Sequence, residues 1–283
     1  MANLKIGITG HDGFFGSHLL KKIKEEFLGT ELSLFDMARY NLLDKNSLKD
    51  FVEGCDVVIH LAGINRGEEK EFLDINAIGT YNLASAIKEW NKSAQLIFSS
   101  SVQVYRPSSK KVYTEKNLPK PASIYGISKR FGEKLIEYLG INHTIFRFTN
   151  IYGENARPNY NSVVATFIHN AINEKPISVN CSLDKRISFL HVKDASSVII
   201  DAIRSPQKGI FNVSNPQIVS MKDFLDILKQ EFSSLEINIK KSSDKKTILT
   251  DSSLANKKFG WQPKHFFKEG ISKVIEFHKQ EGY

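Results

Sequence analysis

The sequence predicts an α/β fold, with a doubly wound parallel sheet and a smaller mixed α/β lobe beside it. Two observations predict the sheet. Short apolar runs alternate with segments of helical periodicity up to about residue 150. The first of these runs breaks into Gly10, Gly13 and Gly16 before a helical pattern begins. A third observation predicts the lobe, because the alternation becomes irregular after residue 153.

The bulk properties favour a globular protein of the cytoplasm. The 283 residues can bury a sizeable core, and no apolar run approaches the ~18 residues of a membrane span. The start of the chain shows no signal-peptide pattern, and Cys55 and Cys181 have no metal-ligand spacing. The net charge of +8 comes from dispersed lysines without an aromatic and basic recognition motif. We therefore expect a cytoplasmic location and no metal, membrane or nucleic-acid partner.

The first half of the chain divides into alternating elements. Expected strands cover residues 4–9, 32–36, 56–63, 95–101 and 143–150, and expected helices cover residues 17–27, 47–53, 76–90 and 124–133. Residues 105–123 are polar and contain prolines, which predicts an exposed loop. The repeated alternation predicts a parallel sheet, in which ligands bind beyond the carboxyl ends of the strands.

The second half predicts a less regular set of elements. Helices are expected at 163–172, at 195–203 and after the capping residue Ser220, and strands at 187–192 and 209–213. Short helices are expected between residues 254 and 277. Neither repeats nor a linker rich in glycine, proline or serine separates independent domains.

The glycine turn between the first strand and the first helix predicts a phosphate site. Gly10, Gly13 and Gly16 permit positive φ, a close approach of the backbone to a pyrophosphate, and tight packing of helix on strand. The N-terminus of the helix offers N–H groups and a positive dipole to an anion. This strand, glycine turn and helix predict dinucleotide binding.

Asp36 ends the second expected strand, twenty residues beyond Gly16. A carboxylate at that place can accept hydrogen bonds from the adenosine ribose and repel a 2′-phosphate, which favours NAD over NADP. Arg39 leaves NADP open, because a guanidinium there could hold the 2′-phosphate. A solvent-facing turn is the alternative interpretation of Asp36.

Tyr125 and Lys129 lie four residues apart and share a face of one expected helix. Such a pair is usually plain surface, but an ammonium beside a phenol favours the phenolate and makes tyrosine a usable base. The pKa of the phenol would have to fall from ~10 toward ~7 to act at neutral pH. We expect Lys129 to supply part of this decrease and the charge of an oxidised nicotinamide to supply the rest.

Together these segments resemble the extended short-chain dehydrogenase/reductase family, in the branch that acts on nucleotide sugars. The resemblance rests on the order of several motifs: Thr9-Gly10-x-x-Gly13-x-x-Gly16, Asp36, His60-Leu-Ala-Gly63, Asn76-x-x-Gly79, Ser101-Val-Gln-Val-Tyr105, Tyr125-x-x-x-Lys129 and Arg147-x-x-Asn150. It implies a Rossmann-like NAD(P)-binding domain at 1–152 with 187–214. It also implies a nucleotide-sugar-binding lobe at 153–186 and 215–283.

The resemblance implies a role for each matching residue. Tyr125 would exchange the proton of a sugar hydroxyl, Ser101 would hydrogen-bond the same oxygen, and Lys129 would hold the nicotinamide ribose. The cofactor-binding residues it implies are Gly10, Gly13, Phe14, Phe15, Gly16, Asp36, Arg39, Asn41, Leu42, Leu61, Ala62, Gly63, Asn76, Ser99, Tyr125 and Lys129. The substrate-binding residues it implies are Ser101, Asn150, Arg186, Lys241 and Asp244. Lys241 departs from the arginine of the family, because a lysine cannot make the same bidentate contact.

Departures from the family narrow the reaction. Val102 and Gln103 stand where the 4,6-dehydratases have Asp-Glu, which argues against elimination. Hydride transfer at sugar C4 remains, either in an epimerase that passes through a 4-keto sugar or in a reductase that consumes NAD(P)H. The segments 60–66 and 157–167 resemble capsular-polysaccharide ketoreductases and favour reduction, whereas Asp36 favours NAD and an epimerase. The balance leans slightly to the epimerase.

Other expectations also follow from the resemblance. A role in surface polysaccharide synthesis is implied, and a homodimer formed through the helix of Tyr125 and Lys129 is expected. A dinucleotide sensor or scaffold without catalysis is the alternative from another class of function.

Overall fold

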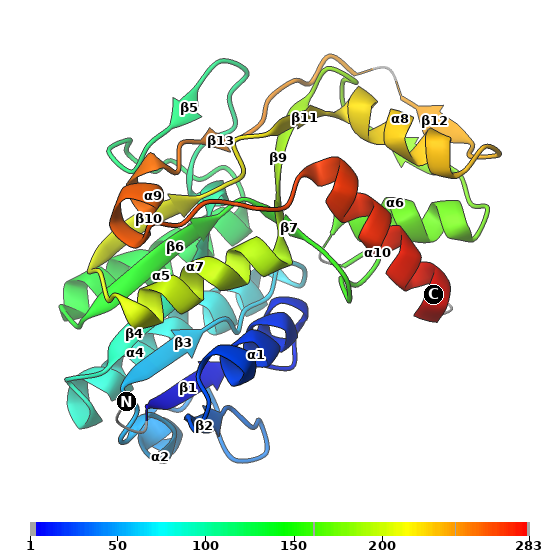
Figure 1. Ribbon diagram of the computed structural model, residues 1–283. Helices are drawn as coiled ribbons and strands as arrows, with labels where there is room; N and C mark the ends of the chain where they lie inside the picture. Colours follow the sequence, from blue (N-terminus) through cyan, green and yellow to red (C-terminus); the bar gives the residue numbers. More distant parts are fainter. Residues whose placement is uncertain (1–3, 161, 241, 282–283) are drawn as a thin grey trace.

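The computed structural model describes residues 4–160, 162–240 and 242–281. Figure 1 shows a central sheet with helices on both faces, and a smaller group of strands and helices at one end of it. The predicted α/β class with a doubly wound, Rossmann-like sheet is confirmed.

The central sheet has six parallel strands in the order β10-β6-β4-β3-β1-β2. Their bounds are β1 Lys5–Thr9, β2 Glu31–Leu34, β3 Val57–His60, β4 Gln95–Ser101, β6 His143–Phe148 and β10 Gly209–Val213. The direction in which strands are added reverses at β1, which lies between β2 and β3. In sheets of this kind, ligands bind beyond the carboxyl ends of the strands.

Successive side chains of the buried strands point to opposite faces of the sheet, and each face has its own core. Ile59 and Ile97 pack with α1 (Phe14–Glu26) and α7 (Val192–Arg204). Val58 and Leu96 pack on the other face with α2 (Lys49–Val52), α4 (Gly79–Trp90) and α5 (Ile124–Leu139). Both faces are therefore covered, as an all-parallel sheet requires.

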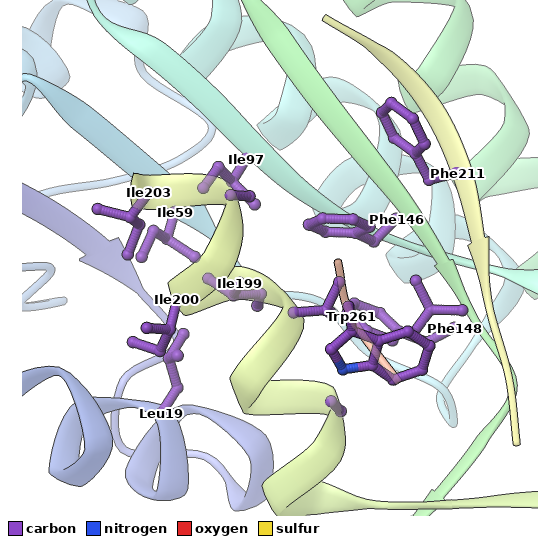
Figure 2. Packing of buried hydrophobic residues seen from close by; sticks show 14 of the residues in the cluster. Leu19, Ile59, Ile97, Phe146, Phe148, Ile199, Ile200, Ile203, Phe211 and Trp261 are labelled. Carbon is purple, nitrogen blue, oxygen red and sulfur yellow. The ribbon is translucent and has the colours of Figure 1, made fainter. Parts of the chain in front are cut away.

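Trp261, late in the chain, returns to the first of these cores. Figure 2 shows its indole beside Phe146, Phe148 and Ile199. The indole nitrogen donates to the carbonyl oxygen of Asp194 at 3.0 Å. The segment around α9 (Ser253–Phe259) therefore packs on the central sheet and not on the lobe.

The lobe is built on a three-stranded sheet and a small parallel pair. The elements are β7 Asn150–Tyr152, β9 Arg186–His191 and β11 Ile218–Ser220, and the pair β8 Ile177–Val179 and β12 Ile237–Ile239. Three helices enclose its core: α6 Val163–Ile172, α8 Met221–Glu231 and α10 Phe267–Glu281. Phe167, Phe189, Phe224 and Phe267 lie at the centre of that core. The division into 1–152 with 187–214 against 153–186 with 215–283 stays a prediction.

Several local expectations differ from the structure. Residues 47–53 form a 3₁₀ turn, η1 (Lys45–Leu48), followed by the short α2, and residues 72–78 form a π-helical segment, η2 (Phe72–Ile78), before α4. The expected loop 105–123 is only partly a loop. Tyr105 is fully buried, and β5 (Val112–Tyr113) pairs with β13 (Leu249–Thr250). Two small elements complete the inventory, α3 (Glu69–Glu71) and η3 (Val102–Val104).

Within the described ranges, no helix combines the length and the apolar character needed to cross a membrane. The same residues contain no group of three or more His, Cys, Asp or Glu side chains that could hold a metal ion.

Candidate active site

The turn after β1 is shaped by close packing of backbone on backbone. Gly10 has φ +70°, and a Cβ there would lie 2.8 Å from the backbone nitrogen of Ala62. A Cβ on Gly16 would overlap the carbonyl oxygen of Gly10. Both positions therefore require glycine, and the turn is pressed against the end of β3.

Helix α1 begins directly after this turn, with Gly13 as its N-cap. Phe14 and Phe15 form its first turn, and the Phe15 ring contacts Phe148 edge-to-face at 5.3 Å between centroids. The N-terminus of α1 is thereby fixed at the carboxyl edge of the sheet. A helix N-terminus beside a glycine turn is suited to a diphosphate.

Asp36 and Arg39 lie in the exposed turn after β2. The Asp36 carboxylate accepts a hydrogen bond from the backbone nitrogen of Ala38 at 2.9 Å. The Arg39 guanidinium lies 5.2 Å from the centroid of the Tyr40 ring. Both side chains are accessible, and the carboxylate keeps acceptor capacity for a ribose hydroxyl.

Asn41 and Leu42 continue this segment toward α4. The Asn41 side chain accepts from the backbone nitrogen of Leu43 at 2.9 Å. The side-chain amide of Asn82 donates to the Leu42 carbonyl oxygen at 2.8 Å. These bonds fix the segment beside the turn that carries Asp36.

Asn76 holds the loop that follows β3. It is fully buried, accepts from the backbone nitrogen of Ile64 at 2.8 Å, and donates to the carbonyl oxygen of the same residue at 2.9 Å. A Cβ on Gly63 would lie 2.8 Å from the Asn76 Oδ1 and 3.0 Å from the Lys129 Nζ. Leu61, Ala62 and Gly63 thus form a narrow backbone surface next to Lys129.

Two of the three candidate catalytic side chains, Ser101 and Tyr125, lie together at the start of α5, and Lys129 lies one turn further along the helix. Ser123 caps this helix, because its Oγ accepts from the backbone nitrogen of Gly126 at 3.1 Å, so that Tyr125 lies in the first turn. Ser101 ends β4 and hydrogen-bonds the Tyr125 side chain. The Lys129 Nζ donates to the carbonyl oxygen of Ser99 at 3.0 Å.

Burial controls the ionisation of this group. It raises the pKa of Tyr125, and the hydrogen bond from Ser101 opposes that increase only in part. Burial also lowers the pKa of Lys129 to about 8, against the opposing charge of Glu133. Desolvation of the phenol is the larger of these two effects on Tyr125, and the expectation that Lys129 and an oxidised nicotinamide lower its pKa stays a prediction.

Buried charged and polar side chains connect α5 to the neighbouring strands of the central sheet. The Glu133 carboxylate accepts from the Ser100 Oγ at 2.6 Å, from the Arg147 Nε and Nη2 at 2.8 and 2.7 Å, and from the Arg130 Nη1 at 2.7 Å. The Arg147 Nη1 donates to the Tyr105 hydroxyl at 2.6 Å. We call Ser100, Tyr105, Arg130, Glu133 and Arg147 the charge network. It ties α5 to β4 and β6 directly beneath Ser101 and Lys129.

A cavity of about 480 Å³ opens above Tyr125. It lies between the loop after β3, the start of α5 and the segment from β7 to α6. Its lining residues are Asn65, Arg66, Phe72, Gln103, Ser123, Ile124, Tyr125, Asn150, Ile151, Tyr160, Ser162, Val163 and Phe189. A volume of this size and a mixed polar and apolar lining are typical of small-molecule sites.

Comparison with known families identifies the chain. Residues 6–214 match the model of the NAD dependent epimerase/dehydratase family. The chain belongs to this family. Its glycine turn, Tyr125 and Lys129 all lie within the matched residues.

This chain is similar to a Pseudomonas aeruginosa protein named UDP-2-acetamido-2,6-beta-L-arabino-hexul-4-ose reductase. The two are 33% identical over 196 residues, which is 68% of this chain. The match spans 47% of the relative, so this chain corresponds to about half of that protein.

Solved structures of related fold cover nearly the whole chain. The UDP-glucose 4-epimerase of Thermotoga maritima, solved with UDP-glucose, matches 99% of this chain and 100% of its own, with a TM-score of 0.86 and 21% identity. RMD from Pseudomonas aeruginosa, complexed with NADPH, matches 99% and 98%, with a TM-score of 0.86 and 23% identity. At these identities the likeness shows the fold.

The substrate residues expected in this epimerase/dehydratase family member are dispersed in the structure. Asn150 lines the Tyr125 cavity, and its amide donates to the Ser188 carbonyl oxygen at 3.2 Å. Arg186 is exposed at the start of β9, and Asp244 pairs with Lys185 at 3.1 Å. Neither lines that cavity, and Lys241 lies outside the described residues.

Sequence reasoning missed the roles of two sets of residues. Arg66 and Gln103 line the cavity. From the sequence, Arg66 was used only as the end of the segment 60–66 and Gln103 only as a departure from the dehydratases, and neither was assigned a binding role. The charge network was missed as well. One signal was present, since Glu133 follows Lys129 by four residues and so lies on the same face of the helix.

Proposed function

We propose that this chain is an enzyme that transfers a proton and a hydride at C4 of a nucleotide sugar, with NAD(P) as cofactor. The observation that carries the proposal is that Tyr125 lines the cavity, is hydrogen-bonded by Ser101, and lies one helical turn before the buried Lys129. Membership of the NAD dependent epimerase/dehydratase family supports the cofactor and the reaction class.

The residues present fit a dinucleotide. The turn from Gly10 to Gly16 leaves no room for a Cβ at either end and exposes the N-terminus of α1, which is the cradle that a diphosphate needs. Asp36 would accept from the adenosine ribose and Lys129 would hold the nicotinamide ribose. The bound nicotinamide supplies the donor or acceptor of the hydride.

Tyr125 acts on the oxygen at C4. The ordinary pKa of a phenol is ~10, so Tyr125 carries a proton at neutral pH that it can give to an oxygen that gains negative charge. Ser101 donates a hydrogen bond to the same oxygen and fixes its position. Reduction of a ketone requires this proton, and oxidation of the alcohol returns it to the phenolate, so the same group serves both a reductase and an epimerase.

Two versions of the reaction remain. Reduction of a 4-keto sugar is supported by the 33% identical relative, which is named a hexul-4-ose reductase. A 4-epimerase, which oxidises and then reduces C4, is supported by the exposed Asp36 carboxylate and the preference for NAD that it predicts. We propose the reductase as the main function and the epimerase as the second candidate.

Two assays separate these versions. The purified protein would be denatured and its released dinucleotide identified, and the native protein would be mixed with a UDP-4-keto-hexose and NADPH or NADH. Oxidation of the added NADPH or NADH, followed by its absorbance, with little dinucleotide carried through purification indicates the reductase. Stoichiometric NAD and turnover of a UDP-hexose without added cofactor indicate the epimerase.

The variant Tyr125→Phe tests whether the chain is an enzyme of this type at all. Loss of the proton donor should lower kcat by about 10²- to 10⁴-fold. The control is Tyr138→Phe on the same helix, whose side chain is 81% exposed and should leave kcat unchanged. If Tyr125→Phe turned over at the wild-type rate, a sensor or scaffold role would replace the enzyme.

We also propose a homodimer. Exposed apolar side chains of η2, α4 and α5 gather on the helices that cover one face of the sheet: Leu73, Ile78, Tyr81, Ile127 and Phe131. Such a patch is typical of an interface. The cytoplasmic location and the role in surface polysaccharide synthesis stay predictions.

A further inference from the structure

Arg66 joins two loops that face each other across the mouth of the Tyr125 cavity. It lies in the loop that follows β3, and its Nε donates to the carbonyl oxygen of Tyr160 at 2.8 Å. Tyr160 belongs to the segment between β7 and α6, 94 residues further along the chain. Both residues line the cavity together with Tyr125.

The donors of Arg66 are only partly used by this contact. A guanidinium carries five N–H donors in a planar fork, and the bond to Tyr160 uses the one on Nε. Among the described residues, the structure shows no further hydrogen bond or ion pair of Arg66. The bond on Nε fixes the plane of the group, so Nη1 and Nη2 are oriented before a ligand arrives.

The charge of Arg66 is unmatched at this site. Among the described residues that line the cavity, it is the one that carries a formal charge at neutral pH. The other polar groups there are amides and hydroxyls. A cation that faces a cavity without an acidic neighbour on its walls is suited to an anionic ligand, and a fork of donors is suited to a phosphate or a carboxylate.

The loop that receives this bond has an unusual backbone. Asn155 and Asn159 have φ of +64° and +59°, a region that residues other than glycine seldom adopt. The backbone nitrogen of Asn159 donates to the Thr166 Oγ1 at 2.8 Å, which ties the loop to α6. Arg66 bonds the same loop through the Tyr160 carbonyl oxygen, so the guanidinium is anchored to a segment that α6 also holds.

We propose that Arg66 binds an anionic oxygen group of the sugar nucleotide, either its diphosphate or a carboxylate on its sugar. This inference rests on the proposed function, because it takes the Tyr125 cavity as the place of the sugar. A hexose whose C4 is at Tyr125 fills part of the 480 Å³ that Arg66 also lines, and its diphosphate on C1 or its carboxylate on C5 is the anionic group that it brings there. Arg66 is thus a residue that selects the substrate by charge.

The test compares ligand binding by the full chain and by Arg66→Met, in the presence of saturating NAD(H). The probes are UDP, UDP-glucose and UDP-glucuronate, and the dissociation constants are measured by calorimetry. Loss of a charge-assisted bond should weaken the relevant probes by about 10- to 100-fold. Arg66→Lys should recover part of the loss, because an ammonium keeps the charge but not the fork. Lys70→Met, next to the same loop and paired with Asp74, is the matched control and should bind like wild type.

Each pattern of results has one meaning. If Arg66→Met weakens all three probes equally, Arg66 binds the diphosphate. If it weakens UDP-glucuronate alone, Arg66 binds the sugar carboxylate. Unchanged binding of all three, or equal weakening of both sugar nucleotides with UDP unaffected, overturns the inference. Failure of the wild type to bind any probe is a different result, because it overturns the proposed function and this inference with it.

Discussion

Two regions of the molecule hold their charged side chains in opposite ways. In the charge network beneath α5, Glu133 and Arg147 are 0% and 2% exposed and share two hydrogen bonds. In the lobe, Lys185 pairs with Asp244 and Lys245 pairs with Asp184, and these side chains are between 24% and 69% exposed. Both regions contain ion pairs, but only the first excludes water from them.

The difference shows which part of the site is built to be rigid. A buried pair is stable only when all its bonds are satisfied, so the network leaves α5 a single position on β4 and β6. Exposed pairs are screened by solvent and contribute little to stability, so they can exchange partners when a ligand arrives. The proton-transfer groups stand on the rigid region, and the predicted nucleotide contacts stand on the adaptable one.

Removing one member of the charge network should produce the largest loss of stability. Arg147→Met leaves the Glu133 carboxylate buried without its bidentate partner, and breaking such a pair costs about 3–5 kcal/mol. We expect a loss near ~3 kcal/mol in the free energy of unfolding, because Arg130 still pairs with Glu133. Urea denaturation followed by circular dichroism measures it.

The control for this variant is Arg204→Met, which breaks the exposed pair with Glu26 at 2.6 Å. That change should cost less than about 1 kcal/mol. Equal losses in the two variants would show that burial of the network contributes nothing beyond an ordinary surface pair.

The second largest loss of unfolding free energy is expected at acid pH, because two buried histidines must then take up protons. Burial lowers the pKa of His60 to about 3 and that of His191 to about 4, whereas both rise to the ordinary value of 6.5 on unfolding. Between pH 6.5 and those values the unfolded chain binds protons that the folded chain does not. Stability is therefore full above pH 6.5 and falls by about 1.4 kcal/mol per pH unit for each histidine.

The variant His191→Asn separates one of these contributions. Asparagine can keep the cap of α7, where the His191 ring accepts from the backbone nitrogen of Lys193. Glu154, Asp194 and His265 also face this ring and set its pKa together with Lys193. The slope of unfolding free energy against pH, measured from pH 6 to pH 5, should decrease by about one histidine's share. An unchanged slope would place the acid sensitivity elsewhere.

The sequence could predict those parts of the fold that depend on local patterns, but not those that depend on contacts between distant residues. Strand and helix alternation is encoded locally, and the expected strand 209–213 coincides with β10. Tyr105 was assigned to an exposed loop because its neighbours are polar and include prolines. Its burial depends on Arg147 and Asn212, which lie far along the chain, and no local pattern carries that information.

The candidate site also has a part that local spacing predicts and a part that depends on contacts between distant segments. Tyr125 and Lys129 share one helix, so their spacing alone predicts that they lie on the same face of it. Arg66 and Tyr160 meet only because two loops close over the cavity, which spacing cannot show. The raised pKa of Tyr125 was unforeseen for a similar reason, since desolvation depends on everything that packs around the phenol.

The smallest effect on stability is expected in the lobe, at Asp244→Asn. Lys185 lowers the pKa of the exposed Asp244 carboxylate by a hydrogen bond, but solvent screens this pair. The urea midpoint should therefore stay at the wild-type value, in contrast to Arg147→Met.

If Asp244 contacts the nucleotide as predicted, the dissociation constant of UDP should rise in Asp244→Asn by about 2- to 10-fold, the size of one hydrogen bond. Asp184→Asn, which breaks the neighbouring pair with Lys245, is the control and should leave UDP binding unchanged. Loss of stability without loss of binding would reverse the assignment, because the lobe pairs would then support the fold and not the ligand.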